Sequence, residues 1–274
     1  MGPLSCRMIL LFPSIMNSRL LFFAAVLLCC VCCSVREDRA GCPCDIFVDL
    51  SSETVALHDS VAVTLTAASG GASRTLVVYP RDYAAGVHVL SDDPRAEYVA
   101  VYPAQLQSYY SGGCFLIPSG LDCPAIHSFN AVCETTGDRA AVTAVLHKNH
   151  CRVNLRFVSS KVHGYSVSLL SDYGGYDKEG APLKTDFRYE LRFDKYNMCE
   201  FCIPRQADNS MQLDIRDTDA LLRRFALGNL IELSGYDWHA ADLRDITMTI
   251  DYSAMKMKIG SDAWNTEIPL QVAI

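Results

Sequence analysis

The sequence lacks the features that mark nucleic-acid-binding proteins and the common classes of enzyme. Its 24 Lys and Arg are outnumbered by 31 Asp and Glu, the formal net charge is −7, and no basic patch stands out. We therefore expect no nucleic acid among its partners. The sequence contains no glycine-rich phosphate loop and no G-x-S-x-G motif, and it displays no Ser/His pair or converging carboxylates for a hydrolase. We predict a protein that is not an enzyme, with no catalytic residues, no metal and no cofactor.

An apolar run near the start of the sequence is too short to span a membrane. Residues Leu20–Cys32 follow Arg19 and fall short of the roughly 20 apolar residues that cross a bilayer. A positive residue before an apolar stretch of this length is typical of a signal peptide. We predict a lipoprotein signal peptide over residues 1–32. The true start is Met1 or Met16, because a start at Met16 gives a compact signal.

The cysteine that carries the lipid has two candidates in this pattern. Cys30 has Leu27 three residues before it, as lipoprotein signals usually require, whereas Cys33 has a cysteine at that place. The pattern alone leaves Cys33 and Cys30 open, with an ordinary cleaved signal without lipid as a further alternative. The residues that follow, 33–44, form the predicted lipid-anchored linker.

Eight cysteines follow Cys33 in the mature chain. Removal of residues 1–32 leaves enough sequence for one large or two ordinary domains, and an even number of cysteines in an exported chain permits disulfides. We predict at least one disulfide, without assigning the pairing, among Cys42, Cys44, Cys114, Cys123, Cys133, Cys151, Cys199 and Cys202.

Two short motifs admit chemistry but are better explained by structure. Cys199-Glu200-Phe201-Cys202 lies in a predicted strand and lacks the helix N-terminus that activates a thiol, which favours a structural bridge or buried thiols. In Cys42-Pro43-Cys44, each cysteine is expected to pair elsewhere, with a free thiol or a metal as alternatives. His147 and His150, next to Cys151, have no nearby fourth zinc ligand, so we expect solvated histidines in a turn.

Alternation of apolar and polar residues dominates the rest of the chain and predicts many short strands. Turn signals punctuate these runs, and one helix is expected where Asp217-Thr218-Asp219 offers an N-cap before the helically spaced Leu221–Leu227. We predict an all-β protein with one short helix in its C-terminal half and two sandwiches, over residues 45–158 and 159–274. The alternating residues are Val61, Val63 and Leu65; Val153, Leu155 and Phe157; Tyr165, Val167 and Leu169; Tyr189, Leu191 and Phe193; Met211, Leu213 and Ile215; Ile246, Met248 and Ile250; Met255, Met257 and Ile259; and Ile268, Leu270, Val272 and Ile274.

Aromatic residues supply the remaining candidate for ligand binding. Such residues can form a platform for a sugar, although they more often pack in a sandwich core or a loop. The residues concerned are Tyr109, Tyr110, Tyr173, Tyr176 and Trp238.

Two groups of motifs stand at the ends of the mature chain. The start has Cys33-Ser-Val-Arg-Glu-Asp-Arg with Cys42-Pro43-Cys44, and the end has Gly235-Tyr236-Asp237-Trp238, Ile250-Asp251-Tyr252 and the late Trp264. With these motifs the sequence resembles the FimB-like fimbrial anchor-subunit family of Bacteroidetes-type bacteria.

The resemblance implies two tandem transthyretin-like β-sandwich domains, a lipid anchor on the outer membrane, and a place at the base of a fimbrium. Such subunits are expected to hold the fibre to the cell and to limit its length, so the implied partners are fimbrial shaft subunits. The resemblance also favours Cys33 as the lipidated residue. Strand complementation would join the subunits, with the segment that carries Ile268, Leu270, Val272 and Ile274 as the candidate edge, unless that segment completes the protein's own sandwich. A surface glycan-binding lipoprotein is the alternative.

Overall fold

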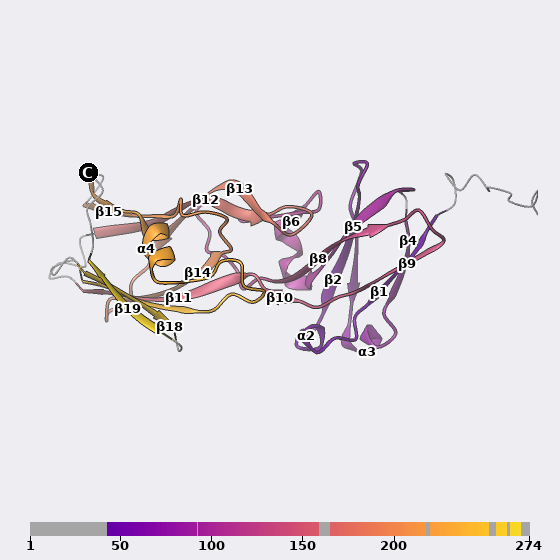
Figure 1. The fold of residues 1–274 in the computed structure, drawn as a ribbon, viewed down its shortest axis with the longest axis horizontal. Helices are drawn as coiled ribbons and strands as arrows, with labels where there is room; N and C mark the ends of the chain where they lie inside the picture. The colour runs from indigo at the N-terminus through magenta and orange to yellow at the C-terminus, as the bar shows by residue number, and fades with distance from the viewer. Residues whose placement is uncertain are drawn as a thin grey trace, which may run out of the picture. The chain divides into compact units, whose positions relative to one another are not determined.

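The structure is a computed structural model that describes residues 43–91, 93–158, 165–217, 220–251, 256–261 and 264–269. It is built from strands with a few short helices (Figure 1). In chain order the elements are β1 (Asp45–Asp49), α2 (Glu53–Ala56), β2 (Val61–Ala67), β3 (Arg74–Val78), α3 (Pro80–Tyr83), β4 (Val87–Leu90), β5 (Ala96–Pro103), η1 (Ala104–Tyr109), β6 (Tyr110–Ser111), β7 (Cys114–Leu116), β8 (His127–Glu134), β9 (Arg139–Thr143), β10 (His147–Lys148), β11 (His150–Val158), β12 (Tyr165–Tyr176), β13 (Pro182–Leu191), β14 (Met198–Pro204), β15 (Gln212–Asp217), β16 (Ala220–Phe225), α4 (Leu227–Leu233), β17 (Ile246–Asp251), β18 (Lys256–Ser261) and β19 (Trp264–Pro269). No helix in these ranges is long and apolar enough to cross a membrane.

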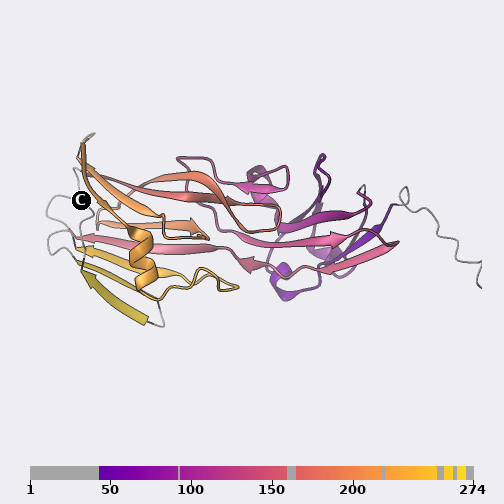
Figure 2. The ribbon, with the colours of Figure 1, turned by 45° about the horizontal axis from the view of Figure 1, so that its top comes forward.

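The N-terminal strands form two sheets around one hydrophobic core. One sheet has the order β4-β1-β9 and the other β10-β8-β5-β2-β3. The alternation predicted for Val61, Val63 and Leu65 is confirmed, since all three are buried in this core. The helices α2 and α3 contact each other at one end of these strands (Figure 1), and Figure 2 shows the same ribbon turned by 45°. The predicted all-β fold is therefore confirmed for this part of the chain.

The C-terminal strands form a second pair of sheets. One has the order β14-β11-β17-β18-β19, and the other runs β16-β15-β12-β7-β6 with β13 also paired to β12. Val153, Leu155 and Phe157 of β11 face the larger hydrophobic core between these sheets. β17 and β18 form an antiparallel pair in which Ile250 lies opposite Met257.

Strands of the N-terminal half extend into the C-terminal sheets. β11 lies before residue 159 but pairs with β14 and, in parallel, with β17. The short β7 pairs with β12, and here Gly175 lies so close to the carbonyl group of Phe115 that a Cβ atom would collide with it. Residues 42–274 form one compact unit, and the domain boundary at residue 159 stays a prediction.

The single predicted helix is displaced along the chain. We predicted it over Leu221–Leu227, but residues 220–225 form β16, which pairs with β15, and the helix α4 begins at Leu227. The buried carboxylate of Asp214 accepts hydrogen bonds from Arg224, at 2.6 Å and 2.8 Å. Tertiary pairing with β15 therefore overrides the local helical spacing, and Asp217 ends a strand instead of capping a helix.

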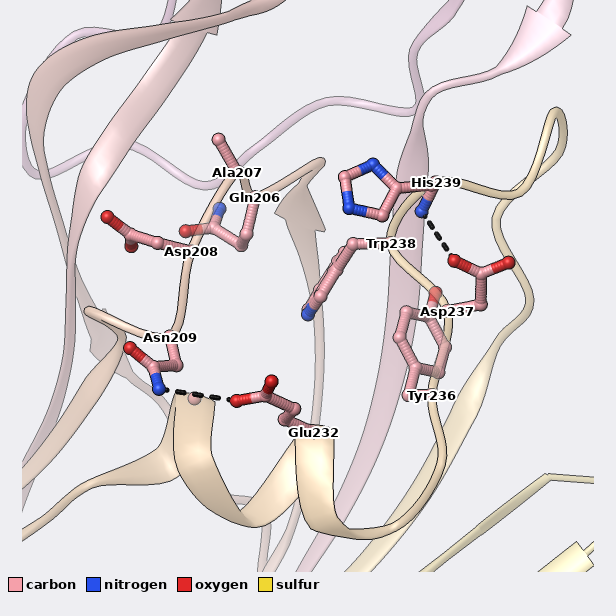
Figure 3. Close-up of a pocket in the computed structure, with 10 residues that line it drawn as sticks. Gln206, Ala207, Asp208, Asn209, Glu232, Tyr236, Asp237, Trp238 and His239 are labelled. Carbon is pink, nitrogen blue, oxygen red and sulfur yellow. Dashed lines mark hydrogen bonds between the residues drawn. The ribbon is translucent and has the colours of Figure 1, made fainter.

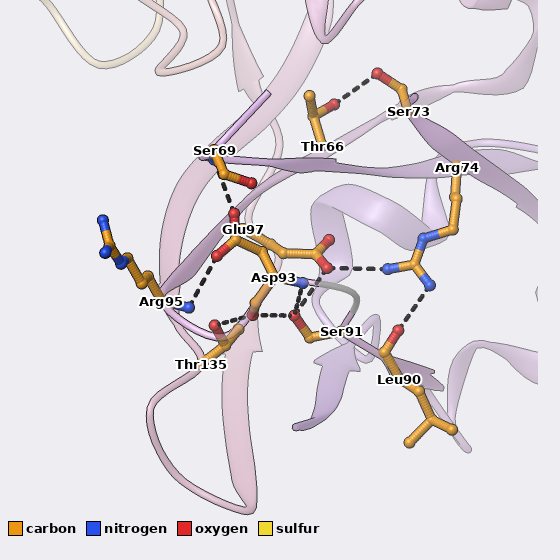
Figure 4. Close-up of polar contacts among 10 residues, drawn as sticks. All are labelled: Thr66, Ser69, Ser73, Arg74, Leu90, Ser91, Asp93, Arg95, Glu97 and Thr135. Atoms are coloured by element: carbon orange, nitrogen blue, oxygen red, sulfur yellow. Dashed lines mark hydrogen bonds and ion pairs between the residues drawn. The ribbon is translucent and has the colours of Figure 1, made fainter. Parts of the chain in front are cut away.

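A buried acidic network fixes the connection between β4 and β5 (Figure 4). Glu97, with 1% of its surface exposed, accepts hydrogen bonds from Arg74 at 2.9 Å and Ser91 at 2.8 Å. The same Arg74 donates to the carbonyl oxygen of Leu90 at 2.7 Å and so links β3 to β4. Hydrogen bonds from Ser69, with others from backbone amides, lower the pKa of Asp93 to about 2. This carboxylate is thus ionised while it holds its loop.

Candidate functional site

The residues predicted to carry the lipid lie outside the described residues. These are Cys33 and the alternative Cys30, and the same holds for Cys42 and for residues 1–32 as a whole. Lipidation therefore stays a prediction.

The predicted partner edge is only partly within the described residues. β19 pairs with β18 and lies at the end of its sheet as far as the structure describes it. Ile268 faces the core opposite Met257, while Glu267 is exposed and pairs with Lys256 at 2.9 Å and Lys258 at 3.3 Å. Leu270, Val272 and Ile274 lie outside the described ranges. Ile268 thus completes the protein's own sandwich, and the other side of β19 remains the candidate edge.

The described cysteines are mostly buried thiols. No pair among Cys44, Cys114, Cys123, Cys133, Cys151, Cys199 and Cys202 is bonded in the structure. Burial raises the pKa of Cys151 to about 12 and that of Cys202 to about 11. Because the thiolate is the reactive form, these thiols are unreactive at neutral pH in the folded chain. The predicted disulfide stays a prediction for the exported chain.

Two groups of cysteines lie close enough for their charges to interact. Cys44 and Cys133 lie together in the N-terminal core, where burial, with a smaller effect of Cys44, raises the pKa of Cys133. Cys123, Cys151 and Cys202 form the second group, in and against the larger core. A disulfide between Cys44 and Cys133 would connect the start of the described chain to β8. This pair is therefore the first candidate for the predicted disulfide.

The C-x-x-C motif lies on β14, where its two side chains point to opposite faces of the strand. Cys199 pairs with Leu155 and faces the core, while Cys202 pairs with Arg152. Residues three apart in a strand cannot face each other. The two cysteines of this motif therefore do not form the active pair of a redox enzyme.

The prediction of solvated histidines is correct for His147 and wrong for His150. The side chain of His147 is 43% exposed and lies 3.6 Å from Asp242. His150 begins β11 with 2% of its surface exposed, and its Nδ1 lies 3.0 Å from both the amide nitrogen and the carbonyl oxygen of Ile126. Burial lowers the pKa of His150 to about 4. Among the described residues, no group of three or more His, Cys, Asp or Glu is placed to hold a metal ion.

Most of the aromatic residues considered for a sugar platform pack inside the protein. Tyr110 stacks on Tyr102 with ring centroids 3.6 Å apart, and Tyr109 stacks on Phe115 at 5.4 Å. Tyr176 is buried, and its hydroxyl accepts a hydrogen bond from the Arg205 amide at 2.7 Å. These rings belong to the larger core or pack against it and do not form an exposed platform.

Trp238 lines a cavity of about 290 Å³ beside α4 (Figure 3). The indole packs edge to face on Tyr236, with centroids 4.6 Å apart. Across the cavity lie Asp208 and Asn209, and Glu232 lies below. The lining residues are Gln206, Ala207, Asp208, Asn209, Gly228, Glu232, Tyr236, Asp237, Trp238 and His239.

Arg205, which the sequence analysis missed, holds the loop that carries Trp238. Its guanidinium donates to the carbonyl oxygens of Trp238 at 2.5 Å, Ala240 at 2.7 Å and Ala241 at 3.0 Å. It also donates to Asn149 at 2.9 Å. No local sequence signal marks this role, because all these partners are distant in the chain. The loop is therefore held rigidly against the end of β14.

The sequence matches no family model and no curated protein, but solved structures share its fold. The fold is that of fimbrial and adhesin-like proteins of the Bacteroidetes. The fimbrial anchor protein Mfa2 from Porphyromonas gingivalis superposes with a TM-score of 0.54 at 14% identity, covering 82% of this chain and 99% of that one. A candidate adhesin from Bacteroides ovatus gives 0.50 at 12% identity, covering 82% and 95%. A candidate polysaccharide-binding protein from Bacteroides thetaiotaomicron gives 0.50 at 10%, covering 83% and 98%.

The comparisons confirm, at the level of the fold, the resemblance to fimbrial proteins that both ends of the sequence carry. At these identities they concern the fold, because one fold hosts many functions.

Proposed function

We propose that this protein is a lipid-anchored subunit that joins a fimbrial shaft to the outer membrane and limits the length of the fibre. The observation that carries the proposal is the match to the fimbrial anchor fold over nearly the whole of that protein, in a chain whose residues 1–32 are predicted to be a lipoprotein signal. The role is structural, and the partners are the shaft subunits and the membrane.

The lipid would be attached at Cys33. A single acyl chain holds a protein at a membrane only marginally, whereas several chains hold it stably. Intact-mass analysis of membrane-extracted protein should give a diacylglyceryl group on Cys33. The C33A variant should be lost from the membrane fraction, whereas the C30A variant should remain bound to the membrane. If C33A stays in the membrane fraction and C30A is lost from it, the lipid is attached to Cys30. Release of the wild-type protein from the membrane would refute lipid anchoring.

The shaft would bind by strand addition at the free side of β19 or through the segment that follows it. Added strands gain affinity from main-chain hydrogen bonds and specificity from alternating side-chain pockets, and an unprotected sheet edge otherwise promotes aggregation. Because Ile268 belongs to the core, the informative truncation removes residues 270–274 and retains Ile268.

The truncated protein should fold and reach the membrane but release fimbriae into the medium. Thermal unfolding of the purified variant shows whether the fold is retained. As a matched control, L233A removes a 71% exposed apolar side chain on α4 and should retain the fimbriae. Fimbriae that stay attached to cells with the folded, truncated protein would place the junction elsewhere.

A further inference from the structure

The cavity beside α4 is rigidly built from three segments. Gln206 is buried, and its amide donates to the carbonyl oxygen of Pro204 at 2.8 Å. Asp208 accepts hydrogen bonds from the Ser210 amide at 2.8 Å and from the Tyr173 hydroxyl at 3.2 Å. Gly228 lies so close to the backbone of Asn209 that a Cβ atom would collide with it. With Trp238 held through Arg205, the cavity needs little ordering when a ligand binds, which lowers the entropic cost of binding.

The polar groups of the cavity restrict the chemistry of a ligand. None of the ten lining residues is Lys or Arg, while Asp208, Glu232 and Asp237 are acidic. An anionic ligand such as a phosphate would therefore be repelled. The carboxylates lie apart around the rim (Figure 3), and they form no group that could hold a metal ion. Because the carboxylates are separated, a ligand with a single ammonium group could pair with only one of them.

One aromatic side chain and one free donor complete the site. Among the described residues the indole N–H of Trp238 has no hydrogen-bond partner, since the contacts of this residue are made through its carbonyl oxygen and its ring. Figure 3 shows the indole between the Tyr236 ring on one side and the Asp208–Asn209 segment across the cavity. The face of an aromatic ring is slightly negative and attracts the slightly positive hydrogens of C–H groups.

We infer that this cavity binds one neutral sugar ring. A sugar has a face of C–H groups that can pack on the indole of Trp238. Hydroxyl groups around its perimeter can donate to the remaining lone pairs of Asp208 and of Glu232, whose Oε2 also accepts a hydrogen bond from the Asn209 side chain at 3.2 Å. One hydroxyl oxygen can accept the free indole N–H. A cavity with an aromatic wall and a few separated polar groups is typical of small-molecule sites. This inference is independent of the fimbrial role and requires no shaft subunit.

The test observes the indole N–H directly in the mature chain. The protein contains two tryptophans, Trp238 and Trp264, so ¹⁵N-indole labelling gives two cross-peaks, which W264F assigns. The probes are glucose, galactose, mannose and N-acetylglucosamine, with Nα-acetyl-lysine amide as a cationic probe. Titration to about 100 mM saturates a site of millimolar affinity, the range expected for a ligand of this size.

The Trp238 cross-peak should shift saturably with at least one of the four sugars, while the Trp264 cross-peak should not move. The variant E232Q should weaken this binding at least about fivefold, the loss expected when a hydrogen bond to a charged group becomes one to a neutral group. E179Q, an exposed substitution outside the cavity, should leave it unchanged. A shift with the lysine probe alone would show a cation site and overturn the inference. A Trp238 cross-peak that no sugar moves, or equal binding to E232Q and wild type, would also overturn it.

Discussion

Lowering the pH should destabilise the folded chain through His150. This ring is buried at the start of β11, with its Nδ1 3.0 Å from the amide nitrogen and from the carbonyl oxygen of Ile126, and burial disfavours its charged form in the folded state. Burial lowers its pKa from 6.5 to about 4. Between these values the unfolded state binds the proton more tightly than the folded state. The contribution to stability is therefore complete above pH 6.5 and is lost progressively as the pH falls toward 4.

The size of the effect follows from the difference between the two pKa values. At 1.36 kcal/mol for each tenfold difference in proton affinity, the fall from 6.5 to about 4 corresponds to roughly 3 kcal/mol in the free energy of unfolding. This is a large part of the 5–15 kcal/mol that is typical of a folded domain. Burial also lowers the pKa values of His58 and His127, whose rings lie in contact, at 5.4 Å between centroids. These two residues add to the loss with the same sign.

The assay is urea unfolding of the mature chain at pH 7.5 and pH 4.5. The variant H150N isolates the contribution of His150, because the Asn oxygen can accept the Ile126 amide and does not titrate in this range. The wild type should lose roughly 2–3 kcal/mol more than H150N between the two pH values. The control H147N changes an exposed ring and should lose as much as the wild type. Equal pH dependence of wild type and H150N would refute the reasoning.

Three further predictions concern packing and thiols. R74M should destabilise the fold by roughly 3 kcal/mol, because it removes the ion pair that Arg74 makes at 2.9 Å with the buried carboxylate of Glu97. R74M/E97M should cost less than the sum of the single changes, and additivity in urea unfolding would contradict this coupling. G175A should lower the melting temperature through its collision with Phe115, whereas G71A, whose Cβ would meet only Ala67 at 3.8 Å, should cost less; equal losses would contradict the packing argument. Non-reducing peptide mapping of the exported protein should find a disulfide, with Cys44–Cys133 the first candidate and a contribution of roughly 2–4 kcal/mol. Eight alkylated thiols would refute it.

The strands were predictable from sequence where one face alone is buried. Val153, Leu155 and Phe157 alternate with exposed or half-exposed residues in β11, so the period of two is visible. The helix was misplaced because Leu221–Phe225 also fits helical spacing, and only the pairing of β15 with β16 decides between them. The strand pairing and the ion pair between Arg224 and Asp214 are contacts between different segments. Local sequence patterns do not indicate such contacts.

The candidate sites were less predictable, for the same reason. The burial of His150 depends on Ile126, and the position of Trp238 depends on Arg205. The sequence drew attention to Trp238 as an aromatic residue, but nothing in it indicated that Asp208 and Glu232 lie around the same cavity. Contacts made across several strands of the fold carry this information.

The retention of fimbriae by cells tests the account most directly. Bacteria that produce wild-type protein, C33A or no protein should be compared for the amount and length of fimbriae on cells and in the medium. The account predicts that wild-type cells keep short fimbriae, whereas cells with C33A or without the protein release long fimbriae into the medium. Fimbriae of normal length that stay attached to cells lacking the protein would contradict its role as the anchor.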